Sequence, residues 1–179
     1  MINKYSFGIT ANHNFKILFL LIFIEILPGC YSFTGGASPE WLKTIYIATV
    51  TDNSGYGDPK YRDYLTTQLV NKFKNDNTFN LVDKNGNARL DAIITNIIEA
   101  PLTIRPGAGQ ELESERKITV NIDAEYYDAV KKKQIWKRTF SSFGTFDISK
   151  NPQTGREKAL KTALDQTADD MLLAVVSGW

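Results

Sequence analysis

The stretch RKITVNIDAEYYD, residues 116–128, alternates between apolar and polar side chains along almost its whole length. Successive side chains of a β-strand point to opposite faces of the sheet, so this alternation predicts an antiparallel strand with one dry and one wet face. The dry face holds Ile118, Val120, Ile122, Ala124 and Tyr126, and the wet face holds Lys117, Thr119, Asn121, Asp123, Glu125 and Tyr127. A strand of this kind needs a hydrophobic layer on one side only.

Further strands flank this one along the chain. A turn at Lys131-Lys132-Lys133 leads into a strand over 134–145, and a strand over 89–100 precedes the alternating segment. In 89–100, a period of two places Leu90, Ala92, Ile94 and Ile98 on one face and Ile93, Thr95 and Ile97 on the other. The pattern also predicts a central strand at 43–50 covered on both faces, a short strand at 79–82 and a loop over 101–114.

Two amphipathic helices complete the pattern. The first begins at Asp58-Pro59, an N-cap followed by proline, and runs to about Lys74. Tyr61, Leu65, Leu69 and Phe73 recur every four residues in it. The second follows Asn151-Pro152, has capping-box spacing at 154–157 and ends at Gly178. Its apolar stripe comprises Leu160, Ala163, Leu164, Thr167, Ala168, Met171, Leu172 and Val175.

These elements predict an α+β fold. Each helix has one apolar stripe, and one face of a sheet can cover both stripes. We therefore expect a two-layer sandwich, with two α-helices packed on one face of a roughly four-stranded, mostly antiparallel sheet. The other face of that sheet is expected to be polar.

The first thirty residues have the features of a lipoprotein signal peptide. An apolar run at 17–27 follows Lys4 and Lys16 and is too short to span a bilayer. It ends in Leu27-Pro28-Gly29-Cys30, which resembles a bacterial lipobox. We expect a signal peptide over 1–29, a lipidated tether over 30–40 and the folded domain over 41–179. The alternative is a conventional signal peptide followed by a free cysteine.

Composition excludes several kinds of chemistry. The chain has 179 residues, with 21 Lys and Arg against 20 Asp and Glu, which gives no overall field for binding nucleic acid. His13, the sole histidine, lies in the predicted signal peptide, and Cys30 is the sole cysteine. The mature domain therefore has no histidine or free thiol for nucleophilic catalysis or for zinc, and we expect neither an enzyme nor a metal site. A carboxylate pair at Asp123 and Glu125 is the remaining catalytic candidate, and its alternative is a solvated strand face.

The most concentrated charge is a basic cluster, which comprises Lys131, Lys132, Lys133, Lys137 and Arg138. One interpretation is a solvated hairpin tip whose lysines keep a sheet edge from pairing. The other is an anion site for lipid phosphates, because ammonium and guanidinium groups suit phosphate.

The mature chain resembles the LptE family of lipopolysaccharide-assembly lipoproteins, in the form found among Bacteroidetes. The matching pieces, in chain order, are Cys30–Gly36, Pro39, Lys43–Ile45, Leu65–Leu69, Lys72-Phe73, Leu81-Val82, Ile118–Val120, Phe140–Phe143, Phe146-Asp147 and Val176–Trp179.

The resemblance implies two helices on a four-stranded sheet and a subunit of the outer-membrane lipopolysaccharide translocon. Such a subunit plugs the LptD β-barrel, assists its assembly and helps deliver lipopolysaccharide to the cell surface. It would be anchored in the outer membrane by diacylglyceryl and acyl chains, such as palmitate, on Cys30, with no other cofactor. Its domain would face the periplasm or the barrel lumen, where the wet face of 117–127 meets the wall. An outer-membrane lipoprotein that regulates a peptidoglycan synthase or a secretion complex is the alternative.

Overall fold

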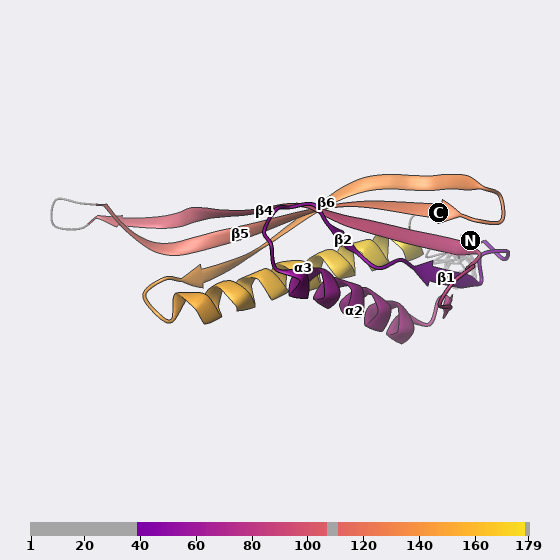
Figure 1. The fold of residues 1–179 in the computed structure, drawn as a ribbon, viewed down its shortest axis with the longest axis horizontal. Coiled ribbons are helices and arrows are strands. Elements are labelled where there is room, and N and C mark those ends of the chain that lie inside the picture. The colour runs from indigo at the N-terminus through magenta and orange to yellow at the C-terminus, as the bar shows by residue number, and fades with distance from the viewer. Residues whose placement is uncertain (1–38, 107–110, 178–179) are drawn as a thin grey trace, which may run out of the picture. The chain divides into compact units, whose positions relative to one another are not determined.

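The structure is a computed structural model that describes residues 39–106 and 111–177. The predicted signal peptide 1–29, Cys30 and all but the end of the tether lie outside the described residues. The described elements are β1 (Thr44–Ile47), β2 (Thr51–Asp52), α2 (Pro59–Asp76), β3 (Asn80–Leu81), β4 (Ala88–Pro106), β5 (Glu111–Asp128), β6 (Lys133–Asp147) and α3 (Pro152–Val176) (Figure 1).

The strands form one mixed sheet. Its order is β3-β1-β4-β5-β6, and β2 also pairs with β4. The long strands β4, β5 and β6 are antiparallel, whereas β1 runs parallel to β3 and β4. The α+β prediction is confirmed, but the sheet has six strands rather than roughly four, two of them only two residues long. The parallel pairs arise because α2 lies between β2 and β3 and acts as a crossover.

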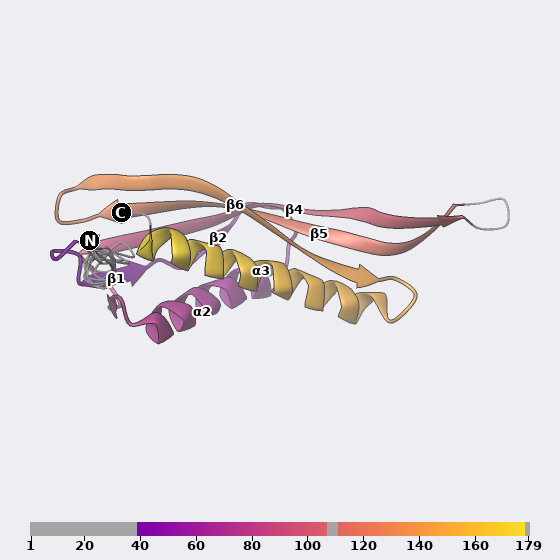
Figure 2. The ribbon, with the colours of Figure 1, turned by 180° about the vertical axis from the view of Figure 1, so that it is seen from behind.

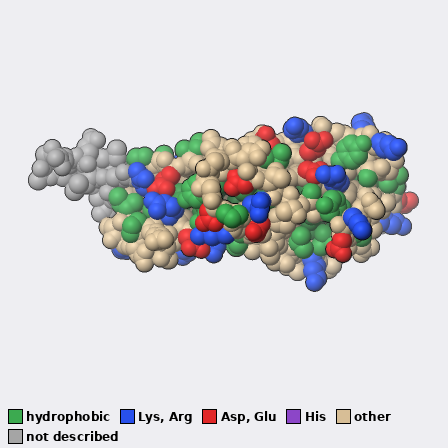
Figure 3. All heavy atoms as spheres, viewed as in Figure 1, with side chains coloured by type: hydrophobic (Ala, Val, Ile, Leu, Met, Phe, Trp, Pro, Cys, Tyr) green, Lys and Arg blue, Asp and Glu red, His purple; other side chains and the backbone are tan. Residues whose placement is uncertain are grey.

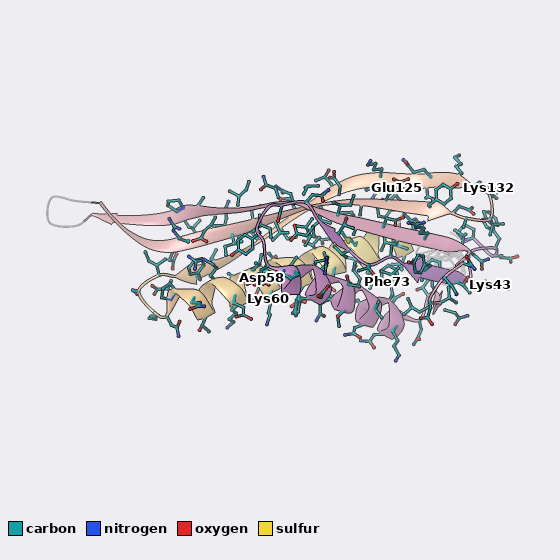
Figure 4. The ribbon with its side chains drawn as sticks, in the orientation of Figure 1. Lys43, Asp58, Lys60, Phe73, Glu125 and Lys132 are labelled. Atoms are coloured by element: carbon teal, nitrogen blue, oxygen red, sulfur yellow. The ribbon has the colours of Figure 1, made fainter. Side chains whose placement is uncertain are left out.

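Both helices lie on the same side of the sheet (Figures 1 and 2). Helix α2 begins as predicted, since the Asp58 carboxylate accepts a hydrogen bond from Lys60 N at 3.1 Å and Pro59 follows the cap. Its four-residue stripe is buried, and Figure 4 shows Phe73 near the end of the helix. Asn77 ends the helix in the left-handed conformation, with φ of 60°.

Helix α3 begins earlier than the capping-box pattern indicates. Asn151 is the N-cap and its side-chain oxygen accepts a hydrogen bond from Thr154 N at 3.3 Å, so Thr154 lies inside the first turn. The predicted capping box is therefore wrong, because a proline directly after a good N-cap residue starts the helix sooner. The apolar stripe is buried except for Leu172, which is partly buried, and the fully buried Thr167 donates its hydroxyl to Ala163 O at 2.9 Å.

Polar contacts fix the two helices to each other. The Tyr64 hydroxyl in α2 donates to the Asp165 carboxylate in α3 at 2.9 Å, and burial together with this hydrogen bond raises the pKa of Tyr64. Farther along, Lys72 Nζ lies 2.6 Å from Asp169 Oδ1. The helix pair therefore packs as one layer over the inner face of the sheet.

A register shift in β4 changes which side chains are buried. The pairing of β4 with β5 skips Thr95, so Ile94 is opposite Ile122 and Ile97 is opposite Val120. After this irregularity Ile97 packs against the core and Ile98 is 46% exposed, which reverses the predicted faces of these two isoleucines. A β-bulge inserts one residue and so breaks the period of two.

Within the segment predicted as a loop over 101–114, residues 101–106 and 111–114 form strand instead. β4 and β5 stay paired as far as Pro106 and Glu111, whereas β6 pairs with β5 only as far as Glu115. The last part of this hairpin is therefore two strands wide. Pro101 and Pro106 suggested a loop, but a two-stranded ribbon has free edges where proline is tolerated.

Candidate functional site

The candidate site is the outer face of the sheet, the side that neither helix covers. Cross-strand partners share a face. The register therefore places in this face the wet residues of β5 together with Arg89, Asp91, Ile93 and Ile98 of β4, Lys137, Thr139 and Phe143 of β6, and Tyr46 of β1. Acidic and basic side chains are interspersed over the face of the molecule shown in Figure 3.

One end of the outer face carries a row of three neighbouring side chains. Tyr46 in β1 is opposite Arg89 in β4, and Arg89 is opposite Tyr127 in β5. The Arg89 guanidinium lies 5.9 Å from the centroid of the Tyr46 ring, and its Nη2 lies 2.6 Å from Asp91 Oδ1. The hydrogen bond to Asp91 raises the pKa of Arg89. A fixed cation thus lies between two aromatic side chains.

This row lies beside a cavity of about 320 Å³. Its lining residues are Tyr46, Lys84, Asn85, Gly86, Arg89, Tyr127 and Ala129. No local sequence pattern predicts this site, because Tyr46 and Arg89 become neighbours only through the parallel pairing of β1 with β4. The predicted burial of both faces of β1 is also wrong, since Ile45 and Ile47 are buried while Tyr46 is half-buried.

The middle of the outer face carries the predicted carboxylate pair. Glu125 is opposite Asp91 and Lys137 on the neighbouring strands, and Figure 4 shows Glu125 on the side of the sheet away from α2. Asp123 accepts a hydrogen bond from the Thr139 hydroxyl at 2.7 Å. Each carboxylate therefore has polar neighbours of its own on a half-buried strand face.

The other end of the outer face is apolar, so the prediction of a polar face is wrong there. Ile98, Thr119 and Phe143 form a row across β4, β5 and β6, with Ile98 46% and Phe143 53% exposed. Lys117 Nζ lies 5.4 Å from the centroid of the Phe143 ring. Leu102, also in β4, is a further apolar side chain that is 47% exposed.

The predicted basic cluster is not a single patch. Lys137 and Arg138 are consecutive in β6, so they lie on opposite faces of the sheet. The Arg138 guanidinium lies 5.4 Å from the centroid of the Trp136 ring. The turn before β6 and the first residue of β6 hold the exposed lysines, namely Lys131, Lys132 and Lys133.

The basic turn is attached to the start of the domain. The Trp41 indole donates a hydrogen bond to Asp128 Oδ2 at 2.8 Å, and the Lys131 ammonium lies 3.4 Å from the centroid of the Trp41 ring. Asp128 also accepts hydrogen bonds from Val130 N and Lys131 N at 2.9 and 2.8 Å. Burial alone raises the pKa of Asp128, but these donors together hold it below its usual value.

We expect Trp41→Phe to lower the free energy of unfolding by about 1 kcal/mol, because it keeps the ring for Lys131 but removes one donor to a buried carboxylate. Chemical denaturation of the full chain measures the change. Lys131→Met is the matched control, since it removes the cation and keeps the indole hydrogen bond. A midpoint for Trp41→Phe equal to that of the unaltered chain would contradict a role for the hydrogen bond.

Neither helix in the described part of the chain is long and apolar enough to cross a bilayer. Among the same residues, no three His, Cys, Asp or Glu side chains come together as metal ligands. The described surface combines a sheet face of mixed polarity, a cavity lined by two cations and an apolar end.

Solved structures share this architecture. A protein from Xanthomonas campestris is 16% identical with a TM-score of 0.53, over 79% of this chain and 90% of that one. Rare lipoprotein B from Shewanella oneidensis is 14% identical with a TM-score of 0.54, over 76% of this chain and 96% of that one. A minor lipoprotein from Acinetobacter baumannii is 12% identical with a TM-score of 0.51, over 76% of this chain and 94% of that one. These likenesses define the class of fold, and no curated protein sequence matches the chain.

The model of the LptE family, described as lipopolysaccharide-assembly, matches residues 42–175. The chain belongs to this family, and the resemblance found in its sequence is confirmed. The family consists of non-enzymatic, cofactor-free lipoproteins, in agreement with the predicted absence of catalysis and of a cofactor.

Proposed function

We propose that this chain is the lipoprotein subunit of an outer-membrane lipopolysaccharide translocon. Lipid on Cys30 anchors it in the outer membrane, and its domain occupies the lumen of an LptD-like β-barrel. There it assists assembly of the barrel and helps deliver lipopolysaccharide to the cell surface. The family match over almost the whole described domain is the observation that supports this most strongly.

The outer sheet face suits such a partner. The interior of a large transmembrane barrel is polar and wet. The middle rows of the outer face carry Asp123, Glu125 and Lys137, whose charged side chains can contact such an interior. The helices keep the hydrophobic core on the other side of the sheet, so the outer face can contact a partner without any loss of core packing.

Purification of the full chain from detergent-solubilised outer membranes tests the proposed partnership. We expect a large outer-membrane β-barrel protein to co-purify. A photo-crosslinking residue at Asn121, on the outer face, is expected to link to that protein, whereas one at Lys158, on α3, serves as the matched control. Recovery of periplasmic enzymes or secretion components without a barrel would favour the alternative, a regulator of a peptidoglycan synthase or secretion complex.

Cys30→Ser tests the anchor. We expect the variant to move from the membrane to the soluble fraction with an unchanged thermal midpoint, because the lipid lies outside the folded domain. Membrane fractionation and circular dichroism measure these two outcomes, and mass spectrometry of the unaltered protein detects the lipid itself. Continued fractionation of the variant with the outer membrane after depletion of the barrel would show that lipidation is not the main anchor.

A further inference from the structure

The cavity beside Arg89 is built by rigid backbone on two sides. Its floor is the row Tyr46, Arg89 and Tyr127, set by strand pairing. Its wall is the loop before β4, where Asn85 has φ of 55°. A Cβ on Gly86 would lie 2.5 Å from Tyr46 N and 2.7 Å from Ala88 O, so only glycine lets this loop pack so closely against β1.

The cavity is positively charged. Lys84 and Arg89 line it, and no carboxylate does. Asp91 lies outside the lining and binds the Arg89 guanidinium through one of its five N–H donors. Asp91 offsets part of the charge, but it also fixes the orientation of the guanidinium. A positioned guanidinium beside an ammonium group suits a dianionic phosphate more than a monoanionic carboxylate.

The aromatic side chains add a second feature. Each tyrosine combines an apolar ring face with a phenolic hydroxyl, a pair of properties that suits a partner with both C–H and O–H groups. The volume of about 320 Å³ is near the lower end for small-molecule sites. A phosphate group alone would leave the tyrosines without a function in binding.

We propose that this cavity binds a phosphate monoester carried on a small polyhydroxyl group, either a soluble sugar phosphate or the phosphate headgroup of a lipid. The phosphate contacts Arg89 and Lys84, and the polyhydroxyl group lies against Tyr46 and Tyr127. This site differs from the basic turn at Lys131–Lys133. It also does not depend on the barrel partnership, so the two proposals can fail separately.

The test uses the full chain in polyoxyethylene detergent micelles, which contain neither sugar nor phosphate. Glucose 1-phosphate, inorganic phosphate and glucose are titrated in turn by calorimetry. We expect glucose 1-phosphate to bind about tenfold more tightly than either other probe, because only it contacts both features of the cavity. No binding of glucose 1-phosphate, or equal binding of inorganic phosphate, would overturn the proposal.

Variants assign the binding to the cavity. Arg89→Gln is expected to weaken glucose 1-phosphate about tenfold or more, and Tyr127→Leu to weaken glucose 1-phosphate while inorganic phosphate stays within about twofold. Lys133→Gln, on the basic turn, removes the same charge as Arg89→Gln and is the matched control. An equal loss with Lys133→Gln would assign the effect to net charge and overturn the proposal. The unfolding midpoint of each variant excludes an effect through folding.

A second arm separates the two sources of phosphate. Phosphatidylinositol 4-phosphate, a lipid whose polyhydroxyl headgroup carries a phosphate monoester, is added to the micelles, with phosphatidylinositol as control, and glucose 1-phosphate is titrated again. Competition by phosphatidylinositol 4-phosphate, lost in Arg89→Gln, identifies a lipid headgroup as the ligand. Unchanged binding of glucose 1-phosphate identifies a soluble sugar phosphate. Equal competition by both lipids would overturn the proposal, since phosphatidylinositol carries no phosphate monoester.

Discussion

Gly144→Ala is expected to lower the free energy of unfolding by about 3 kcal/mol or more. A Cβ at Gly144 in β6 would lie 2.6 Å from the carbonyl carbon of Ala159 in α3, and closer still to its oxygen. The obstacle is helix backbone, so no rotation of a side chain can relieve it. Either α3 must move away from β6 or the strand must bend, and both responses open the core.

Denaturation in urea, followed by far-UV circular dichroism, measures this loss. Ser141→Thr is the matched control, because it adds one carbon to an exposed position of the same strand. We expect its midpoint to stay within about 0.5 kcal/mol of the unaltered chain. If Gly144→Ala were equally mild, the close approach of α3 to β6 would not exist in solution.

Glu99→Gln is expected to lower the free energy of unfolding by about 2 kcal/mol. Glu99 extends from β4 to two cations: its Oε1 lies 2.7 Å from Arg116 Nη1 in β5, and its Oε2 lies 2.8 Å from Arg156 Nε in α3. The Glu99 side chain is only 18% exposed, so loss of its charge removes the carboxylate that two partly exposed guanidinium groups share. This carboxylate joins the start of α3 to the sheet.

Arg62→Gln, which breaks a surface pair with Asp63, is the control and is expected to have little effect on the free energy of unfolding.

The pH dependence of the same variant provides a second measurement. The hydrogen bond from Arg156 lowers the pKa of Glu99, with burial opposing it and Arg116 assisting. Tyr56 is a further titratable group close to Glu99 and Arg156. A carboxylate whose pKa is lower in the folded state stabilises the fold above its unfolded pKa, and this contribution is lost as the pH falls through the folded pKa. The difference in stability between the unaltered chain and Glu99→Gln should therefore be largest near pH 7 and shrink below about pH 4.5. A difference independent of pH would contradict this assignment.

The regular parts of this fold could be predicted from the sequence. The four-residue spacing of Leu65, Leu69 and Phe73 and the cap at Asp58 located α2, and the alternation over 116–128 separated the two faces of β5. These signals are local, so neighbouring residues contain all the information that they need.

The errors came from features that depend on contacts between distant segments. The irregularity at Thr95 reverses Ile97 and Ile98, and a strict period of two cannot reveal it. The strand pairing beyond Pro101 depends on a partner strand, whereas proline suggests a loop. The row of Tyr46, Arg89 and Tyr127 needs the strand order, and periodicity does not contain that order. Consecutive charges such as Lys137 and Arg138 formed a cluster in the sequence but lie on opposite faces of β6.

The attachment of Trp41 to Asp128 and Lys131 sets how far the domain can travel from a membrane. If Cys30 is lipidated as proposed, the chain between it and Trp41 can span at most about 40 Å, even fully extended. The turn between β5 and β6 is then confined close to the bilayer. β5 is 18 residues long, so its opposite end can lie roughly 60 Å farther from the bilayer than this turn. A lipid on Cys30 would thus limit the distance between the bilayer and the β5–β6 turn more tightly than the distance between the bilayer and the β4–β5 end.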